Sequence, residues 1–163
     1  MEKTKDNVSM HVKPVIDATI NTLETMCELK FTHGKPAWYD RDHKIDAVSI
    51  ITTIEFTSEL LCLSLSLLFP KQTYLSIISS MLGEEFTELD ESITDGAAEI
   101  MNMIYGQAKT ALTNQNISVS MAIPKVIWGE EVSIHYFGNL KKALLPFKKD
   151  NMTFYLNIAF SND

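Results

Sequence analysis

The sequence predicts an α+β domain in which long helices cover one face of an antiparallel sheet. Apolar residues recur at helical spacing in two long segments, residues 12–28 and about 90–113. Several other segments alternate apolar and polar residues with a period of two, as half-buried antiparallel strands do. The predicted order is helix, strands, helix, helix, strands, and this order suits a sheet with helices packed on one face.

The composition is that of one acidic, soluble domain. The chain has 163 residues, of which 45% are hydrophobic and 21% charged, and its formal net charge is −7. At this length about two-thirds of the unfolded surface is buried on folding, which is enough for one core. The acidic balance argues against a nucleic-acid partner, which Lys and Arg would have to hold, and against an anionic membrane surface.

The N-terminus and the cysteines indicate a cytoplasmic protein. Residues 1–9 are polar and lack a signal-peptide core, so we expect a flexible N-terminus followed by a single domain over residues 10–163. Cys27 and Cys62 lie in apolar segments and are predicted to be reduced thiols. The most apolar run, Leu60–Phe69, is half the length of a membrane span and alternates like a strand.

The first predicted helix covers residues 12–28, with Pro14 in its first turn, where the missing N–H costs nothing. Gly34, Pro36 and the polar run Asp40–Lys44 then indicate a short strand and a turn. Two alternating segments follow, and they predict strands over residues 48–56 and 61–69 joined by a turn at residues 57–59.

Local signals delimit the next two helices. Pro70 can open a helix, and Gly83 stands where a C-terminal glycine is favoured. An acidic connector over residues 84–90 leads to Asp90, which is predicted to cap a long helix that ends near Thr113.

The last third of the chain is predicted to form strands again. Alternation favours strands over residues 117–123, 132–136 and 154–160. The basic pairs at residues 141–142 and 148–149 are interpreted as part of a solvated loop. Trp38 and Trp128 lie near turns and are expected at the margin of the sheet.

The long helix has two faces of different character. Its apolar stripe is predicted to pack on the sheet, and it consists of Ala97, Met101, Ile104, Ala108 and Leu112. The opposite stripe consists of Asp95, Glu99, Asn102, Gly106 and Lys109. Glu99 and Asn102 are three residues apart, so their side chains project from the same face.

The same helix contains Gly96 and Gly106, and each glycine costs about 1 kcal/mol relative to alanine. One interpretation is a solvated face with glycines that let the helix pack on its neighbour. The other is a surface that another molecule approaches closely. Spacing does not separate the two.

A resemblance to a known family bears on this choice. The segment Glu99-Ile-Met-Asn102, within residues 95–109, resembles the E-x-x-N signature of CheX-type chemotaxis phosphatases, a family that includes CheC and is related to flagellar switch proteins. Phe69-Pro70-Lys71, leading into a helix that ends Met81-Leu82-Gly83, is also similar to the family segment before the signature. The order of elements fits from about residue 10 to 160.

The number of signatures resembles CheX rather than CheC. CheC-type proteins carry the signature on two helices, whereas this chain has it once. In the first helix Asp17 is followed by Asn21, which misses the spacing, and no other glutamate is followed by an asparagine three residues later.

The resemblance implies a phosphatase that accelerates hydrolysis of the aspartyl phosphate on a CheY-like response regulator. Asn102 would orient the attacking water, and Glu99 would pair with the receiver's lysine. The receiver would bring its own Mg²⁺, and this chain would bind no metal or other cofactor. The receiver would also contact the rest of this helix face, namely Asp95, Ala98, Gly106 and Lys109.

The family also implies a homodimer formed by sheet extension. The alternative is a non-catalytic module of the same fold that binds a receiver or a flagellar switch component. Other chemistries have less support, because the four histidines lack zinc-ligand spacing and are predicted at the surface or on edge strands. The sequence has no nucleophile elbow and no phosphate-binding loop.

Overall fold

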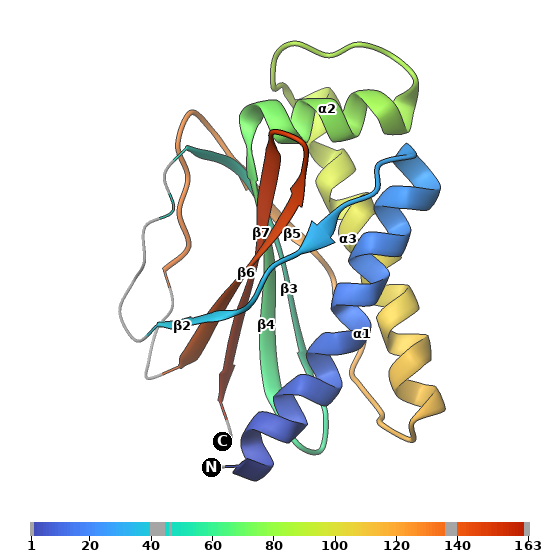
Figure 1. Cartoon of the computed structure of the whole chain (residues 1–163), viewed down its shortest axis with the longest axis vertical. Helices are drawn as coiled ribbons and strands as arrows, with labels where there is room; N and C mark the ends of the chain where they lie inside the picture. The colour runs from blue at the N-terminus through green and yellow to red at the C-terminus, as the bar shows by residue number, and fades with distance from the viewer. Residues whose placement is uncertain (1, 40–44, 46, 136–139, 162–163) are drawn as a thin grey trace.

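The computed structural model describes residues 2–39, 45, 47–135 and 140–161. It confirms an α+β fold in which three helices lie on one side of an antiparallel sheet (Figure 1). The helices are α1 (Glu2–Cys27), α2 (Lys71–Leu82) and α3 (Glu91–Asn114). The strands are β1 (Thr32–His33), β2 (Ala37–Tyr39), β3 (Val48–Thr57), β4 (Cys62–Pro70), β5 (Lys125–Trp128), β6 (Lys141–Lys149) and β7 (Met152–Ser161).

The sheet is built from two long hairpins. β3 pairs with β4 and β6 with β7, and the two hairpins join where β4 pairs with β7. The strand order is β1-β6-β7-β4-β3-β5, with β2 also paired to β6, and every pairing is antiparallel. The main core lies between this sheet and the helices, where alternate strand residues such as Ile54, Leu65 and Leu156 are buried.

The start of α1 differs from the prediction. The helix begins at Glu2, ten residues earlier than the apolar periodicity indicates, so residues 2–9 belong to it. Val8 is already buried in the core, which explains why this polar segment is helical. Pro14 consequently lies inside the helix rather than in its first turn, and its missing N–H leaves the carbonyl of Met10 without the usual helical donor.

The predicted ends of α2 and α3 are confirmed. Pro70 is the residue before α2, and Gly83 follows the helix with a φ of 66°, in the left-handed region that glycine adopts without strain. Asp90 caps α3, because its carboxylate accepts a hydrogen bond from the backbone N–H of Ser92 at 2.8 Å. Hydrogen bonds from Ser92 also lower the pKa of this carboxyl.

The strands predicted over residues 48–56, 61–69 and 154–160 are confirmed as β3, β4 and β7, but the two predictions for residues 117–123 and 132–136 are wrong. Residues 117–123 form only an isolated bridge between Val119 and Ser58, and the strand on that edge, β5, begins at Lys125. Met121 and Ile123, two of the apolar positions of that alternation, are 90% and 84% exposed. Residues 132–135 form no strand, and Tyr136 lies outside the described residues.

The solvated loop predicted from the basic pairs at residues 141–142 and 148–149 is wrong, because residues 141–149 form the strand β6. Its alternate residues Ala143, Leu145 and Phe147 are buried beneath the helices, while Lys pairs occupy both ends. Lys142 itself is only 6% exposed, and its ammonium lies 5.5 Å from the centre of the Tyr39 ring.

Other local predictions have mixed outcomes. The short strand before residue 40 is confirmed as β1 and β2, whereas the turn at Asp40–Lys44 lies outside the described residues. Trp38 and Trp128 lie on strands at the two margins of the sheet, as expected. Both cysteines are free thiols. No helix in the described part of the chain has the length and apolar character needed to cross a membrane.

The histidine prediction fails at one position. His33 on the edge strand β1 and His135 are exposed as predicted, and His43 lies outside the described residues. His11 is fully buried instead, and its ring nitrogens bond the carbonyl of Asn7 at 2.7 Å and the hydroxyl of Ser58 at 2.9 Å. It ties α1 to the β3–β4 turn.

Candidate functional site

The helix α3 presents the predicted residues on one outward face. Its inner stripe, Ala97, Met101, Ile104, Ala108 and Leu112, is buried as predicted. The side chains of Asp95, Glu99 and Asn102 are exposed, as is Gly106, and Ala98 and Lys109 are half-buried at the border. The structure therefore brings all six predicted site residues onto a single surface about four helical turns long.

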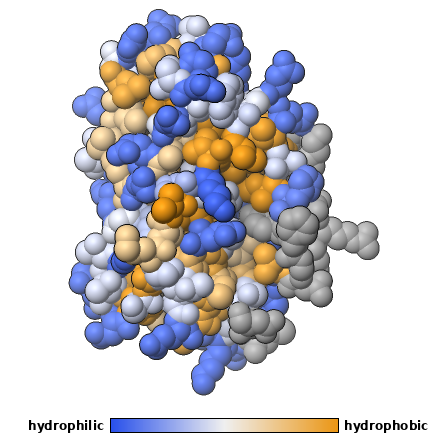
Figure 2. All heavy atoms as spheres, turned by 180° about the vertical axis from the view of Figure 1, so that it is seen from behind, coloured by the Kyte–Doolittle hydropathy of each residue, from blue (hydrophilic) through white to orange (hydrophobic). Residues whose placement is uncertain are grey.

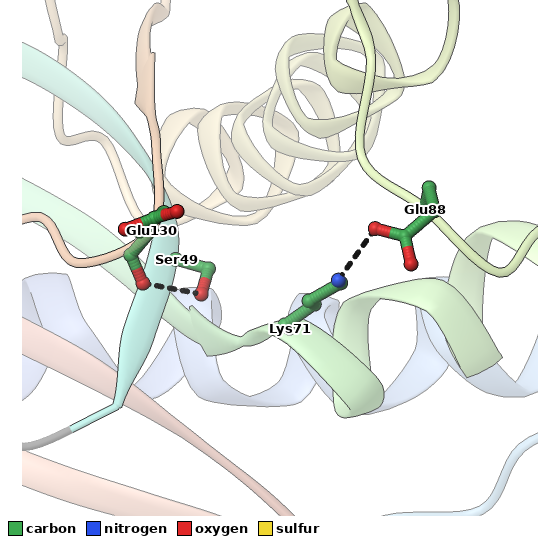
Figure 3. Close-up of polar contacts among 4 residues, drawn as sticks. All are labelled: Ser49, Lys71, Glu88 and Glu130. Atoms are coloured by element: carbon green, nitrogen blue, oxygen red, sulfur yellow. Dashed lines mark hydrogen bonds and ion pairs between the residues drawn. The ribbon is translucent and has the colours of Figure 1, made fainter.

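Three polar side chains of this face have no hydrogen-bond or ion-pair partner within the described part of the chain. Among the residues that the structure describes, none forms a hydrogen bond or ion pair with the side chains of Glu99, Asn102 or Lys109. Nearby charges are paired instead: Lys71 at the start of α2 lies 2.7 Å from Glu88 of the connector before α3 (Figure 3). A carboxylate, an amide and an ammonium thus remain available to a partner on one helix face.

Figure 3 also shows how the edge strand beside α3 is held. The hydroxyl of Ser49 on β3 donates to the backbone carbonyl of Glu130, at 3.3 Å, just after β5. The backbone N–H of Gly129 donates to the carbonyl of Ser49 at 3.0 Å. These contacts fix β5, which packs beside α3, to the main sheet.

The surroundings of the two glycines of α3, Gly96 and Gly106, differ. A Cβ at Gly96 would lie 2.3 Å from Cδ1 of Ile78 and 3.0 Å from the hydroxyl of Tyr74, so this glycine lets α2 and α3 pack closely. A Cβ at Gly106 would meet nothing within 4 Å. The packing interpretation therefore holds for Gly96, whereas no neighbour among the described residues requires a glycine at position 106.

Two tyrosines anchor α3 against its surroundings. The hydroxyl of Tyr74 donates to the carbonyl of Ile93 at 2.5 Å, and that of Tyr105 donates to the carbonyl of Ser120. Burial raises the pKa of both hydroxyls, and the charge of Asp95 adds to the rise at Tyr74. Both groups therefore stay protonated and act as structural donors, which sequence reasoning missed.

A hydrogen-bonded bridge links α3 to α1, on the other flank of the face. The side-chain amide of Asn21 donates to Oε1 of Gln107 at 2.9 Å, and Nε2 of Gln107 donates to the hydroxyl of Thr22 at 3.0 Å. Asn21, the asparagine of the off-spacing pair on α1, is thus already used in helix pairing. Sequence reasoning missed Gln107, although it directly follows the open Gly106.

The described residues offer little for a metal ion. No group of three or more His, Cys, Asp or Glu side chains gathers within the described ranges. Asp95 and Glu99 are four residues apart on the face and supply two carboxylates, whereas a Ca²⁺ site in a protein takes about six to eight oxygen ligands.

Comparison with known proteins identifies the family. Residues 50–148, which run from within β3 to within β6 and include the whole of α3, match the family described as chemotaxis phosphatase CheX. The chain belongs to the CheX family. The resemblance seen in the Glu99-Ile-Met-Asn102 segment is thereby confirmed at the level of the family.

Relatives cover nearly the full chain. The CheY-P phosphatase CheX of Thermotoga maritima is 26% identical over 149 residues, which cover 90% of this chain and 94% of the relative. The crystal structure of a CheC-like superfamily protein from a Shewanella species superposes with a TM-score of 0.83 at 30% identity, covering 93% of this chain and 97% of that one. The CheX–CheY–BeF₃–Mg²⁺ complex of Borrelia burgdorferi gives a TM-score of 0.72 at 23% identity, covering 92% and 97%.

Proposed function

We propose that this CheX-family protein is a phosphatase that accelerates hydrolysis of the aspartyl phosphate on a CheY-like response regulator, in chemotaxis or a related two-component pathway. Two comparisons support this substrate. The Thermotoga maritima relative is a CheY-P phosphatase, and the Borrelia burgdorferi structure is a complex of CheX with CheY. We further propose that the protein works in the cytoplasm as one domain.

The proposal rests chiefly on one observation: Glu99 and Asn102 are exposed, unpaired within the described residues and one helical turn apart on α3. In the free protein water solvates both groups, and a docked receiver can replace this water with partners of its own. The amide of Asn102 can accept one hydrogen bond from a water and donate another to a phosphoryl oxygen. It can therefore hold that water in line with the phosphorus.

In this mechanism Asn102 acts by orientation. Phosphoryl transfer passes through a loose transition state, so positioning and electrostatics supply most of the catalysis. An amide cannot accept the water's proton as a general base, so its contribution is to lower the entropic cost of placing the nucleophile. The receiver supplies Mg²⁺, and this chain adds the ordered water.

Glu99 sets the position of the helix on the receiver. Its carboxylate is proposed to pair with the lysine beside the receiver's phosphate, and an ion pair across a desolvated interface contributes specificity and register. Gly106, where even an added methyl group would meet no atom within 4 Å, lets the receiver's backbone approach α3 closely. Asp95, Ala98 and Lys109 complete the contact surface.

We also propose that the protein pairs with a second copy through the edge strand β5. Apolar side chains gather around this edge, where Met121 and Ile123 are almost fully exposed and Ile127 and Trp128 are partly exposed. Figure 2 views the molecule from behind and shows apolar residues gathered on that face. An edge strand has unpaired N–H and C=O groups, so pairing with a second β5 would satisfy them and cover these side chains.

The experiment that tests the function measures phosphate release from a panel of phosphorylated receivers with and without this protein. We expect acceleration for the cognate receiver, and Glu99→Ala is expected to weaken both the complex and the rate. Glu24→Ala, on the exposed surface of α1, is the matched control. Binding of a receiver without any acceleration would overturn the proposal and identify a non-catalytic interaction module.

A further inference from the structure

A groove of about 720 Å³ lies between α1 and α3, directly beside the candidate site. On the α3 side it begins at Gln107, the neighbour of the open Gly106, and continues through Ala111 to Gln115. On the α1 side it is lined by Ser9, Met10, Lys13, Pro14, Asp17, Ala18 and Asn21. The groove and the outward face of α3 therefore form one continuous surface.

The size of the face indicates that a partner must extend beyond it. From Asp95 to Lys109 the helix is about 21 Å long, and its exposed stripe is about 10 Å wide, which gives about 200 Å². Stable protein–protein interfaces bury about 800 Å² on each partner, and even weak transient ones need several hundred. A receiver that reaches Asn102 must therefore also contact a flank of α3.

The two flanks of α3 differ. On one, Tyr105 bonds the carbonyl of Ser120, so the segment after α3 fills the space against the helix. On the other, the surface between α1 and α3 is hollow. A projecting element of a partner fits only into the hollow flank, which singles out the α1–α3 groove.

The chemistry of the groove is that of an interface with an apolar floor and a polar rim. Met10, Pro14, Ala18 and Ala111 supply apolar surface, and Met10 is 42% exposed. The rim carries Lys13 and Asp17, and neither forms an ion pair with any residue in the described ranges.

We propose that this groove is the second docking element for the phosphorylated receiver. A receiver loop or helix end that carries an apolar side chain flanked by charged residues enters it while Asn102 reaches the phosphate. The inference rests on the function proposed above and adds α1 to the receptor surface. It places receiver specificity at Lys13, Asp17 and Ala111, away from the residues that act on the phosphate.

The test compares steady-state kinetics of variants in the groove with matched controls outside it. Asp17→Lys reverses a rim charge, and Ala111→Trp fills the hollow. Glu24→Lys on α1 and Ser76→Trp on α2 make the same kinds of change on exposed positions outside the lining. Thermal melting of each variant verifies that it folds, and Asp17→Lys remains informative if Ala111→Trp does not.

We expect both groove variants to raise KM for the phosphorylated receiver about tenfold, which corresponds to a loss of about 1.4 kcal/mol of binding free energy, with kcat unchanged. Both controls should behave as the wild type. Unchanged KM in the groove variants, with wild-type acceleration intact, would overturn the docking inference alone. Absence of acceleration by the wild type would instead overturn the proposed function.

A cross-linking experiment identifies the occupant. A photoreactive amino acid at position 111 is expected to form an adduct with the receiver when its phosphorylation site carries a beryllium fluoride mimic. An adduct only between two copies of this chain would show that the groove is a self-association surface and would overturn the proposal.

Discussion

The two glycines of α3 predict opposite responses to the same substitution. In Gly106→Ala the new methyl group meets no atom within 4 Å, so the variant keeps the native packing. Alanine is favoured over glycine in a helix by about 1 kcal/mol, because glycine loses more backbone entropy on folding. The free energy of unfolding should rise by about that amount, which for a chain of this size raises Tm by about 2–4 °C.

Gly96→Ala is the matched opposite case. The methyl group would be placed 2.3 Å from Cδ1 of Ile78 on α2, and Ile78 is fully buried, so it has little room to move away. Overpacking of this kind costs about 1–3 kcal/mol, which offsets or exceeds the gain in helix propensity. We expect a net loss in the free energy of unfolding of up to about 2 kcal/mol.

Urea denaturation of the wild type and both variants, followed by circular dichroism, measures the two effects. The same samples should be assayed with the phosphorylated receiver, where Gly106→Leu is expected to raise KM because its side chain occupies the docking face. An increase in stability for Gly96→Ala equal to that of Gly106→Ala would refute the packing argument. A loss of stability in Gly106→Ala would refute the claim that its surface is open.

Three further predictions concern the cap, the buried thiol and the sheet edge. Asp90→Ala should lower Tm at pH 7, because the variant lacks the carboxylate that caps α3. The pKa of Asp90 is lowered in the fold, so the carboxylate is protonated and its stabilisation lost at acid pH. The difference in Tm between the wild type and Asp90→Ala should therefore shrink below about pH 4. An equal difference at pH 3 and pH 7 would contradict this. Burial raises the pKa of the Cys27 thiol from 9.0 to about 11, so its contribution to stability should be full below pH 9 and be lost towards pH 11. The free energy of unfolding should therefore fall more steeply in the wild type than in Cys27→Ala over this range, by at most about 1.4 kcal/mol per pH unit, and parallel curves would contradict this. Ile127→Lys should convert the proposed dimer to a monomer in sedimentation velocity, and a wild type that sediments as a monomer would exclude the dimer.

Local chemistry made the helices and the long hairpin strands predictable. Pro70, Gly83 and Asp90 act through their own backbones, so their signals do not depend on distant residues. The start of α1 was not predictable in this way. Its first turns are polar, and they are helical because Val8 packs into a core formed by much later parts of the chain.

Alternation was less reliable near the sheet edge. Residues 117–123 alternate because Ile117 and Val119 pack on the core, but the edge of β3 is occupied by β5, which begins to pair at Thr53. Pro124, which has no N–H to donate, precedes that pairing. In β6 the four lysines masked an alternating strand, because the burial of Ala143, Leu145 and Phe147 depends on the neighbouring β7.

Some features of the candidate site were likewise predictable from local sequence, and others were not. Helical periodicity alone places Glu99, Asn102 and Gly106 on one face, because their spacing fixes their direction. Which glycine is needed for packing depends on where α2 lies, and the groove depends on how α1 pairs with α3. These are tertiary relationships between segments far apart in the sequence, and no local pattern encodes them.

The proposed mechanism depends above all on Asn102, which would order the water that attacks the receiver's aspartyl phosphate. The most direct measurement is the rate of phosphate loss from the phosphorylated receiver at saturating concentrations of wild type, Asn102→Ala and the control Asn114→Ala, an exposed asparagine at the end of the same helix. We expect Asn102→Ala to bind the receiver but to leave its phosphate at the receiver's own rate of hydrolysis, whereas Asn114→Ala accelerates hydrolysis like the wild type. Acceleration by Asn102→Ala equal to that of the wild type would contradict the mechanism.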